Sequence, residues 1–145
     1  DTIRDNPASY LDIAEFIQTN GIIINKNLHQ LWRRIVFNIT VSNTDDHLRN
    51  HGFILTPKGW ILSPAYDINP SIHKDGLSLN IDMDSNALDL ELAKTVGEYF
   101  RLDGKQMDGI IDEVIRSVGQ WRIIAGEIGI SRAEQELMAA AFIGG

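Results

Sequence analysis

The fold is decided by residues 28–50, which read LHQLWRRIVFNITVSNTDDHLRN. Apolar side chains in the first half of this stretch recur at the spacing of one helix face. They are Leu28, Leu31, Trp32, Ile35, Val36 and Ile39. The stripe predicts an amphipathic helix from about Asn25 to Ser42-Asn43, with this face buried. The polar second half is expected to be a loop that the helix positions.

Toward the N-terminus, a shorter helix is expected before this one. Asn6 and Pro7 are typical of a helix start, with asparagine as the N-cap and proline at the first helical position. This helix is expected to run to about Asn20, where Gly21 supplies the end.

On the other side of the polar loop, the apolar period changes to two. Residues 52–55 and 60–62 flank Thr56-Pro57-Lys58-Gly59, in which an early proline and a late glycine favour a β-turn. A β-hairpin is therefore predicted here. Residues 77–81 are a possible third strand.

The remainder of the chain is predicted to be helical. Residues 88–100 form one expected helix, and residues 104 to about 124 form another that repeats the apolar stripe. Ser131 and Glu134 have the spacing of a capping box, which is expected to open a last helix through Phe142. The predicted fold is mainly α (α+β overall), a helical lobe with a small β-hairpin insertion.

Composition narrows the class of protein. The chain has 145 residues, of which 43% are hydrophobic and 23% charged, as expected of a single domain spanning residues 1–145. It has no cysteine, which excludes disulfides and thiolate metal sites and fits a cytoplasmic protein. No apolar run is long enough to span a membrane. A net charge of −7 argues against direct nucleic-acid binding.

Chemistry-bearing residues gather after the long helix. Asp45, Asp46, His47 and Asn50 lie in the polar loop, and Asp67 follows the predicted hairpin. Phosphoryl transfer needs a carboxylate base and hard oxygen ligands for Mg²⁺. Protein kinases place the base aspartate five residues before a metal-binding asparagine and supply a second aspartate after a short β segment. The spacing and order of Asp45, Asn50 and Asp67 fit this pattern.

Two stretches carry a resemblance to a known family. Residues 43–50 read NTDDHLRN and residues 59–71 read GWILSPAYDINPS. The first resembles the catalytic loop of HipA-type kinases, and the second resembles another signature of that family. The match is dense from about residue 31 to residue 71, and the two signatures together are specific where either alone is not.

The resemblance implies a kinase-like C-terminal lobe and a serine/threonine protein kinase activity that uses ATP and Mg²⁺. It implies a bacterial type II toxin–antitoxin role, with a helix-turn-helix antitoxin of the HipB type and a protein substrate as partners. By position, Asp45 matches the catalytic base, and Asn50 and Asp67 match the residues that bind the metal and hence the nucleotide. His47 falls where the family has a loop histidine, which we expect to orient the loop or Asp67 and not to transfer a proton.

One part of a kinase is missing from the pattern. A kinase needs a small-lobe lysine that holds the α- and β-phosphates. No strand before Asp45 carries such a lysine, and Lys26 at a helix start is a poor substitute. The chain also begins without a methionine. It is therefore expected to be a fragment that lacks the N-terminal ATP-binding lobe and to be a poor enzyme by itself.

Each residue also has a structural interpretation. Asp45 could be a turn residue, Asn50 a loop amide and Asp67 a cap. Asp46 is expected to be solvated or to cap the hairpin, and the Arg33-Arg34 pair to lie on a solvated helix face with salt bridges. The other histidines are expected in surface or loop positions: His29, His51 and His73. The tryptophans are expected to pack in the core: Trp32, Trp60 and Trp121.

Two alternatives to a kinase stay open. The first is a non-catalytic interaction lobe that binds an antitoxin or a companion subunit. The second is a metal-dependent phosphohydrolase built on the Asp45-Asp46-His47 cluster. Such hydrolase sites usually draw several histidines into one centre, whereas this cluster contains one.

Overall fold

The computed structural model describes residues 8–44, 46–47, 50–65, 76–77, 79–81 and 85–142. The helices are α1 (Tyr10–Asn20), α2 (Ile24–Val41), α3 (Leu90–Thr95), α4 (Gly104–Val118), α5 (Trp121–Glu127) and α6 (Arg132–Met138). Short 3₁₀ helices are η2 (Gly97–Phe100) and η3 (Ala139–Ala141), and the strands are β1 (Phe53–Thr56) and β2 (Gly59–Leu62). The prediction of a mainly α fold with one small hairpin is confirmed.

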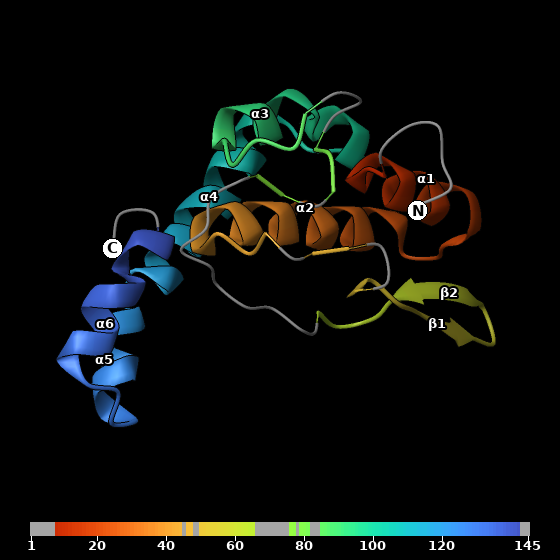
Figure 1. The fold of residues 1–145 in the computed structure, drawn as a ribbon. Helices are drawn as coiled ribbons and strands as arrows, with labels where there is room; N and C mark the ends of the chain where they lie inside the picture. Colours follow the sequence, from red (N-terminus) through yellow and green to blue (C-terminus); the bar gives the residue numbers. More distant parts are fainter. Residues whose placement is uncertain are drawn as a thin grey trace.

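Helix α2 runs through the middle of the molecule (Figure 1). Helices α3 and α4 lie on one side of it, the hairpin lies on the other, and α5 and α6 lie together near one end. All six side chains of the predicted stripe are fully buried, which confirms both the helix and its inward face. Trp32 adds a hydrogen bond, because its Nε1–H donates to the carbonyl of Ala93 at 2.9 Å.

Helix α1 begins later than the sequence suggests. Ser9 is the N-cap, and it forms a capping box with Asp12 in which each side chain accepts from the other residue's backbone N–H. Since Ser9 has an extended backbone, the predicted start at Asn6-Pro7 is wrong. The box satisfies two N–H groups that would otherwise have no partner, which fixes the start at Tyr10. The predicted end at Asn20 is confirmed.

The hairpin pairs Phe53 with Leu62 and Thr56 with Gly59 in an antiparallel register. The Thr56 hydroxyl accepts from the backbone N–H groups of Lys58 and Gly59, which closes the turn. Gly59 has a φ of 141°, a value that favours glycine. The predicted hairpin is therefore confirmed, with strands that begin at residues 53 and 59.

The possible third strand is wrong for the part of residues 77–81 that the structure describes. Asn80 forms only an isolated bridge with Ser9. The alternating apolar residues are nevertheless buried against the core: Leu77, Leu79 and Ile81. Burial of these apolar side chains explains the apolar pattern without a strand partner.

Two long helices of the prediction are each broken in two. The segment 88–100 becomes α3 and η2, separated by Val96. The segment 104–124 becomes α4 and the start of α5, separated by Gly119 and Gln120. The apolar period continues across both breaks, so periodicity alone does not reveal them. Ser131 caps α6 as expected, by accepting from the Glu134 N–H.

The three tryptophans have different environments. Trp32 is fully buried, as predicted. Trp60 is 36% exposed and contacts the ring of Phe16 edge-on, so its expected core position is wrong. Trp121 is partly buried and stacks on Phe142 with ring centroids 4.4 Å apart.

A search of the described helices found none long and apolar enough to cross a membrane.

Replacement of Trp32 by phenylalanine is expected to lower the free energy of unfolding by about 2–4 kcal/mol, since it leaves a cavity and an unpaired buried carbonyl at Ala93. The same change at the partly exposed Trp60 is expected to cost at most about 1 kcal/mol. Urea denaturation of the two variants measures the difference. Equal losses would contradict the assignment of Trp32 to the centre of the core.

Candidate functional site

The polar loop starts at an abrupt change of direction at the end of α2. Ser42 has a left-handed backbone with a φ of 56°, and its N–H donates to the carbonyls of Asn38 and Ile39. The next N–H, of Asn43, donates to the carbonyl of Asn38 at 2.8 Å. The Ser42 hydroxyl donates to the carbonyl of Ala141 at 2.6 Å, so the C-terminal segment holds the start of the loop.

Two of the predicted site residues, His47 and Asn50, meet in one tight turn. The backbone N–H of His47 donates to Oδ1 of Asn50 at 2.8 Å, and the N–H of Asn50 donates to the His47 carbonyl at 2.9 Å. Asn50 is buried and His47 is partly buried. The Asn50 side chain thus holds the turn. A carboxamide oxygen has two lone pairs, so this hydrogen bond is compatible with ligation of a cation.

The other two predicted site residues, Asp45 and Asp67, lie outside the described residues. Their roles therefore stay predictions. Asp45 is bonded along the chain to Thr44 and Asp46, both described, and Asp67 follows Ala65 by two residues. Within the described part of the chain, no three histidine or carboxylate side chains are grouped so as to hold a metal ion. The proposed donors, a carboxamide and a carboxylate, are hard oxygens of the kind that Mg²⁺ prefers.

Asp46 is buried, and its expected solvated position is wrong. Its Oδ2 accepts three hydrogen bonds: from Tyr10 Oη at 2.6 Å, from Asn38 Nδ2 at 3.0 Å and from His51 Nε2 at 2.6 Å. Asn43 extends the network, since its Nδ2 donates to Oδ1 of Asn38 at 3.0 Å. These donors satisfy a carboxylate that would otherwise be costly to bury.

His51 and Arg34 complete this network, and both side chains are buried. His51 lies in a loop as expected, whereas the expected solvated position of Arg34 is wrong. Nη1 of Arg34 lies 3.1 Å from Nδ1 of His51. Because a guanidinium only donates, Nδ1 accepts and the ring carries its proton on Nε2, which points at Asp46. Nη2 of Arg34 donates to the carbonyl of Ser63, at the end of β2.

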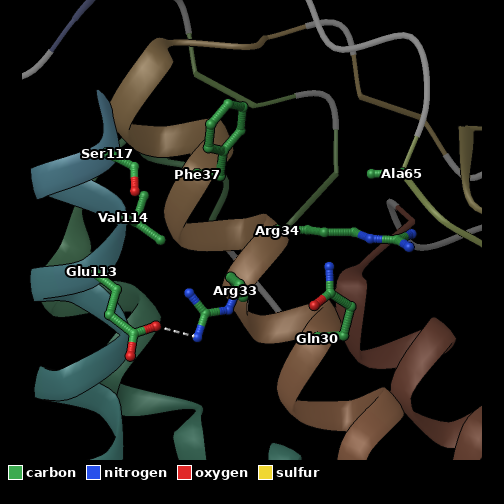
Figure 2. A pocket seen from close by; sticks show the side chains of 8 residues that line it. All are labelled: Gln30, Arg33, Arg34, Phe37, Ala65, Glu113, Val114 and Ser117. Atoms are coloured by element: carbon green, nitrogen blue, oxygen red, sulfur yellow. Dashed lines mark hydrogen bonds and ion pairs between the residues drawn. The ribbon is translucent and has the colours of Figure 1, made fainter. Parts of the chain in front are cut away.

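The neighbouring Arg33 behaves as the sequence predicts. Successive residues on a helix point about 100° apart, and Figure 2 shows Arg33 directed toward α4 while Arg34 extends to the side of Ala65. Arg33 forms an exposed salt bridge of 2.6 Å with Glu113. His29 is also at the surface, where its Nε2 lies 3.0 Å from the Arg101 carbonyl. His73 lies outside the described residues.

A hollow of about 290 Å³ lies between α2, α4 and the segment that follows β2 (Figure 2). Its lining residues are Gln30, Arg33, Arg34, Phe37, Ala65, Glu113, Val114 and Ser117. The hollow therefore borders the segment that leads to Asp67, and neither His47 nor Asn50, the two described residues of the 47–50 turn, lines it.

Sequence reasoning missed the buried network, although it left a signal. Arg34 and Asn38 are four residues apart, so they share one side of α2. This side of α2 lies next to the apolar stripe, so its residues are close to the buried face of the helix. Two polar residues at this spacing, followed by adjacent aspartates in the next loop, indicate an internal polar cluster.

A comparison with protein families finds a match over most of this fold. The family model of the HipA-like C-terminal domain matches residues 2–122, which is most of the chain. The chain therefore belongs to the HipA-like C-terminal domain family. Most of α5 and all of α6 lie beyond the matched residues. A search among curated proteins finds no significant match.

The buried Tyr10 predicts a specific loss of stability in alkali. Burial first, and then the Asp46 carboxylate beside the hydroxyl, raise the pKa of Tyr10 well above its ordinary value of 10.0. The unfolded state therefore loses this proton at a lower pH than the folded state. Stability from this group is complete below about pH 10 and falls above it, by at most about 1.4 kcal/mol per pH unit.

Urea denaturation at pH 8 and pH 11, for the wild type and Tyr10→Phe, isolates this contribution from other groups. The stability advantage of the wild type over the variant is expected to shrink between the two pH values. An advantage that stays constant would show that the Tyr10 phenol ionises as it does in the unfolded chain.

Proposed function

We propose that this chain is the catalytic lobe of a bacterial serine/threonine protein kinase of the toxin–antitoxin type. The observation that carries the proposal is the 47–50 turn, in a chain that belongs to the HipA-like C-terminal domain family. The turn fixes the side chain of Asn50. Asn50 belongs to the same loop as Asp45, which precedes it by five residues. This is the spacing of the base and the metal-binding asparagine in protein kinases.

In this proposal Asp45 accepts the proton of the protein hydroxyl that attacks the γ-phosphate of ATP. Asn50 and Asp67 hold Mg²⁺, which when bound would neutralise charge on the nucleotide phosphates. His47 acts through its backbone, because its N–H fixes the Asn50 side chain. The polar loop would supply Asp45, His47 and Asn50, and the segment after β2 would supply Asp67.

The proposal extends to the whole protein. We expect an N-terminal lobe that supplies the phosphate-binding lysine, so that the chain alone transfers phosphate poorly. The expected partners are a protein substrate and a helix-turn-helix antitoxin, in the cytoplasm. The charge of −7 argues that contact with DNA, if an antitoxin complex makes one, comes from the partner.

A second candidate function, a non-catalytic interaction lobe, has one observation in its favour. Helices α5 and α6 and the turn between them leave large apolar side chains exposed: Ile123, Ile124, Ile128 and Leu137, each more than half exposed. Exposed apolar groups of this size are typical of contact surfaces. The same surface is also compatible with a kinase that binds a partner there.

Phosphoryl transfer by the full-length protein distinguishes the two functions. Asp45→Asn is expected to lower Mg²⁺-dependent transfer from ATP by about a hundredfold or more, since acid–base groups typically contribute this much. The measurement is incorporation of labelled phosphate into the protein itself or into a lysate. Asp112→Asn, which changes an exposed aspartate on α4, is the matched control and should be fully active.

A wild type that binds ATP but transfers no phosphate, with Asp45→Asn indistinguishable from it, would favour the interaction lobe. Equal activity of the wild type and Asp45→Asn would instead refute the role of Asp45 as base.

A further inference from the structure

Three buried side chains outside the predicted catalytic set form a continuous bridge. Arg34 comes from α2, His51 from the segment before β1, and Asp46 from the polar loop. Arg34 donates to His51 at 3.1 Å, and His51 donates to Asp46 at 2.6 Å. Arg34 also donates to the carbonyl of Ser63, so the bridge reaches the end of β2. These three residues are called the Arg34–His51–Asp46 bridge below.

The bridge includes the chain neighbours of Asp45 and Asn50, and it also contacts a residue four positions before Asp67. Asp46 is the neighbour of Asp45, and His51 is the neighbour of Asn50. Ser63 precedes Asp67 by four residues. Adjacent Cα atoms are only 3.8 Å apart, so anchoring one residue restricts the position of the next. The same anchor points are also tied to each other, since the Ser63 N–H donates to the carbonyl of Gly52 at 2.9 Å.

We propose that the Arg34–His51–Asp46 bridge is a positioning device that sets the base and the metal-binding residues at their working separation. This inference rests on the proposed kinase function and adds three positioning residues to it. None of the three needs to touch the substrate. They act by holding the loop and the end of β2 to one point on α2.

The chemistry of the bridge requires a group such as imidazole at its centre. The guanidinium of Arg34 can only donate, and the carboxylate of Asp46 accepts. A middle residue must therefore accept at one end and donate at the other, as His51 does. Glutamine has the same pair of functions in its carboxamide, whereas leucine has neither. A comparison of glutamine and leucine at position 51 therefore tests whether His51 acts through its hydrogen bonds or only by filling space.

Burial makes the bridge a unit. Arg34 and Asp46 are 5% and 4% exposed, and the charges of the two ends offset each other through the ring. Removing either end leaves the other charge buried without compensation, which is strongly destabilising. A substitution at His51 keeps both charges and interrupts only the connection. His51 is therefore the position at which positioning can be tested with the least damage to folding.

The test uses the full-length protein with His51→Leu, His51→Gln and, as a matched control, Arg33→Gln. Arg33 is next to Arg34 but forms an exposed salt bridge, so its variant is expected to have wild-type activity. His51→Leu is expected to lower kcat for transfer from ATP by about 10–100-fold, with KM for ATP changed less than about threefold. His51→Gln is expected to recover most of that loss.

Thermal unfolding of each variant is measured together with the kinetics. It shows whether the variant is folded at the assay temperature, so that a lower kcat is not caused by unfolded protein. A His51→Leu protein that is folded and has the wild-type kcat would overturn the inference. So would a His51→Gln protein as impaired as His51→Leu, because that result means that the site requires the shape of the ring and not the hydrogen bonds.

Failure of the kinase proposal itself has a different signature, namely a wild type that transfers no phosphate. In that case amide hydrogen exchange gives the answer. His51→Leu is then expected to speed exchange at least about tenfold at the amides of Asn50 and Ser63, which close the loop and the end of β2. His51→Gln should leave both amides protected. Unchanged exchange in His51→Leu would show that the bridge holds neither segment.

Discussion

One carboxylate oxygen organises this molecule. Oδ2 of Asp46 accepts hydrogen bonds from Tyr10 on α1, from Asn38 on α2 and from His51 before the hairpin. These donors come from three segments that are separate along the chain. Their hydrogen bonds to one oxygen fix the positions of the three segments relative to one another. A buried polar group must be satisfied or it opposes folding. A packing of the three segments that separated any donor from this oxygen would lose a buried hydrogen bond, so the network favours this arrangement over such alternatives.

The rest of the core surrounds this hydrogen-bond network with ordinary apolar packing. The stripe of α2 is fully buried, and Trp32 fixes α3 through the carbonyl of Ala93. The loop that follows α2 is held at its start by Ser42 and in its middle by Asn50. A polar loop thus rests on a rigid helix, which is how folds commonly present groups that act on a ligand. The proposed chemistry concerns this loop, which lies within the residues that match the HipA-like family.

Much of the fold could be predicted from the sequence, because its strongest signals are local. The stripe of α2 and the Pro57–Gly59 turn each determine their structure within a few residues. The breaks at Val96 and Gly119 could not be predicted, since the apolar period runs through them. The buried network was missed for a related reason. Tyr10 is 36 residues from Asp46 along the chain, and a pattern that spans only a few residues cannot reveal a contact between them. In the candidate site, spacing pointed to Asn50 and the family resemblance to His47, and the structure places these two residues in one turn. Asp45 and Asp67 rest on spacing and family resemblance alone.

The hydrogen bond from Ser42 to Ala141 has a consequence for how the protein is made. Its two partners are 99 residues apart along the chain. At ordinary translation rates, a ribosome needs about 5–20 s to add the residues between them. During that interval α2 and the loop have emerged, but the carbonyl that anchors their junction does not yet exist. The polar loop of a nascent chain thus gains this anchor only after Ala141 has been synthesised, and a chain interrupted before Ala141 lacks the hydrogen bond.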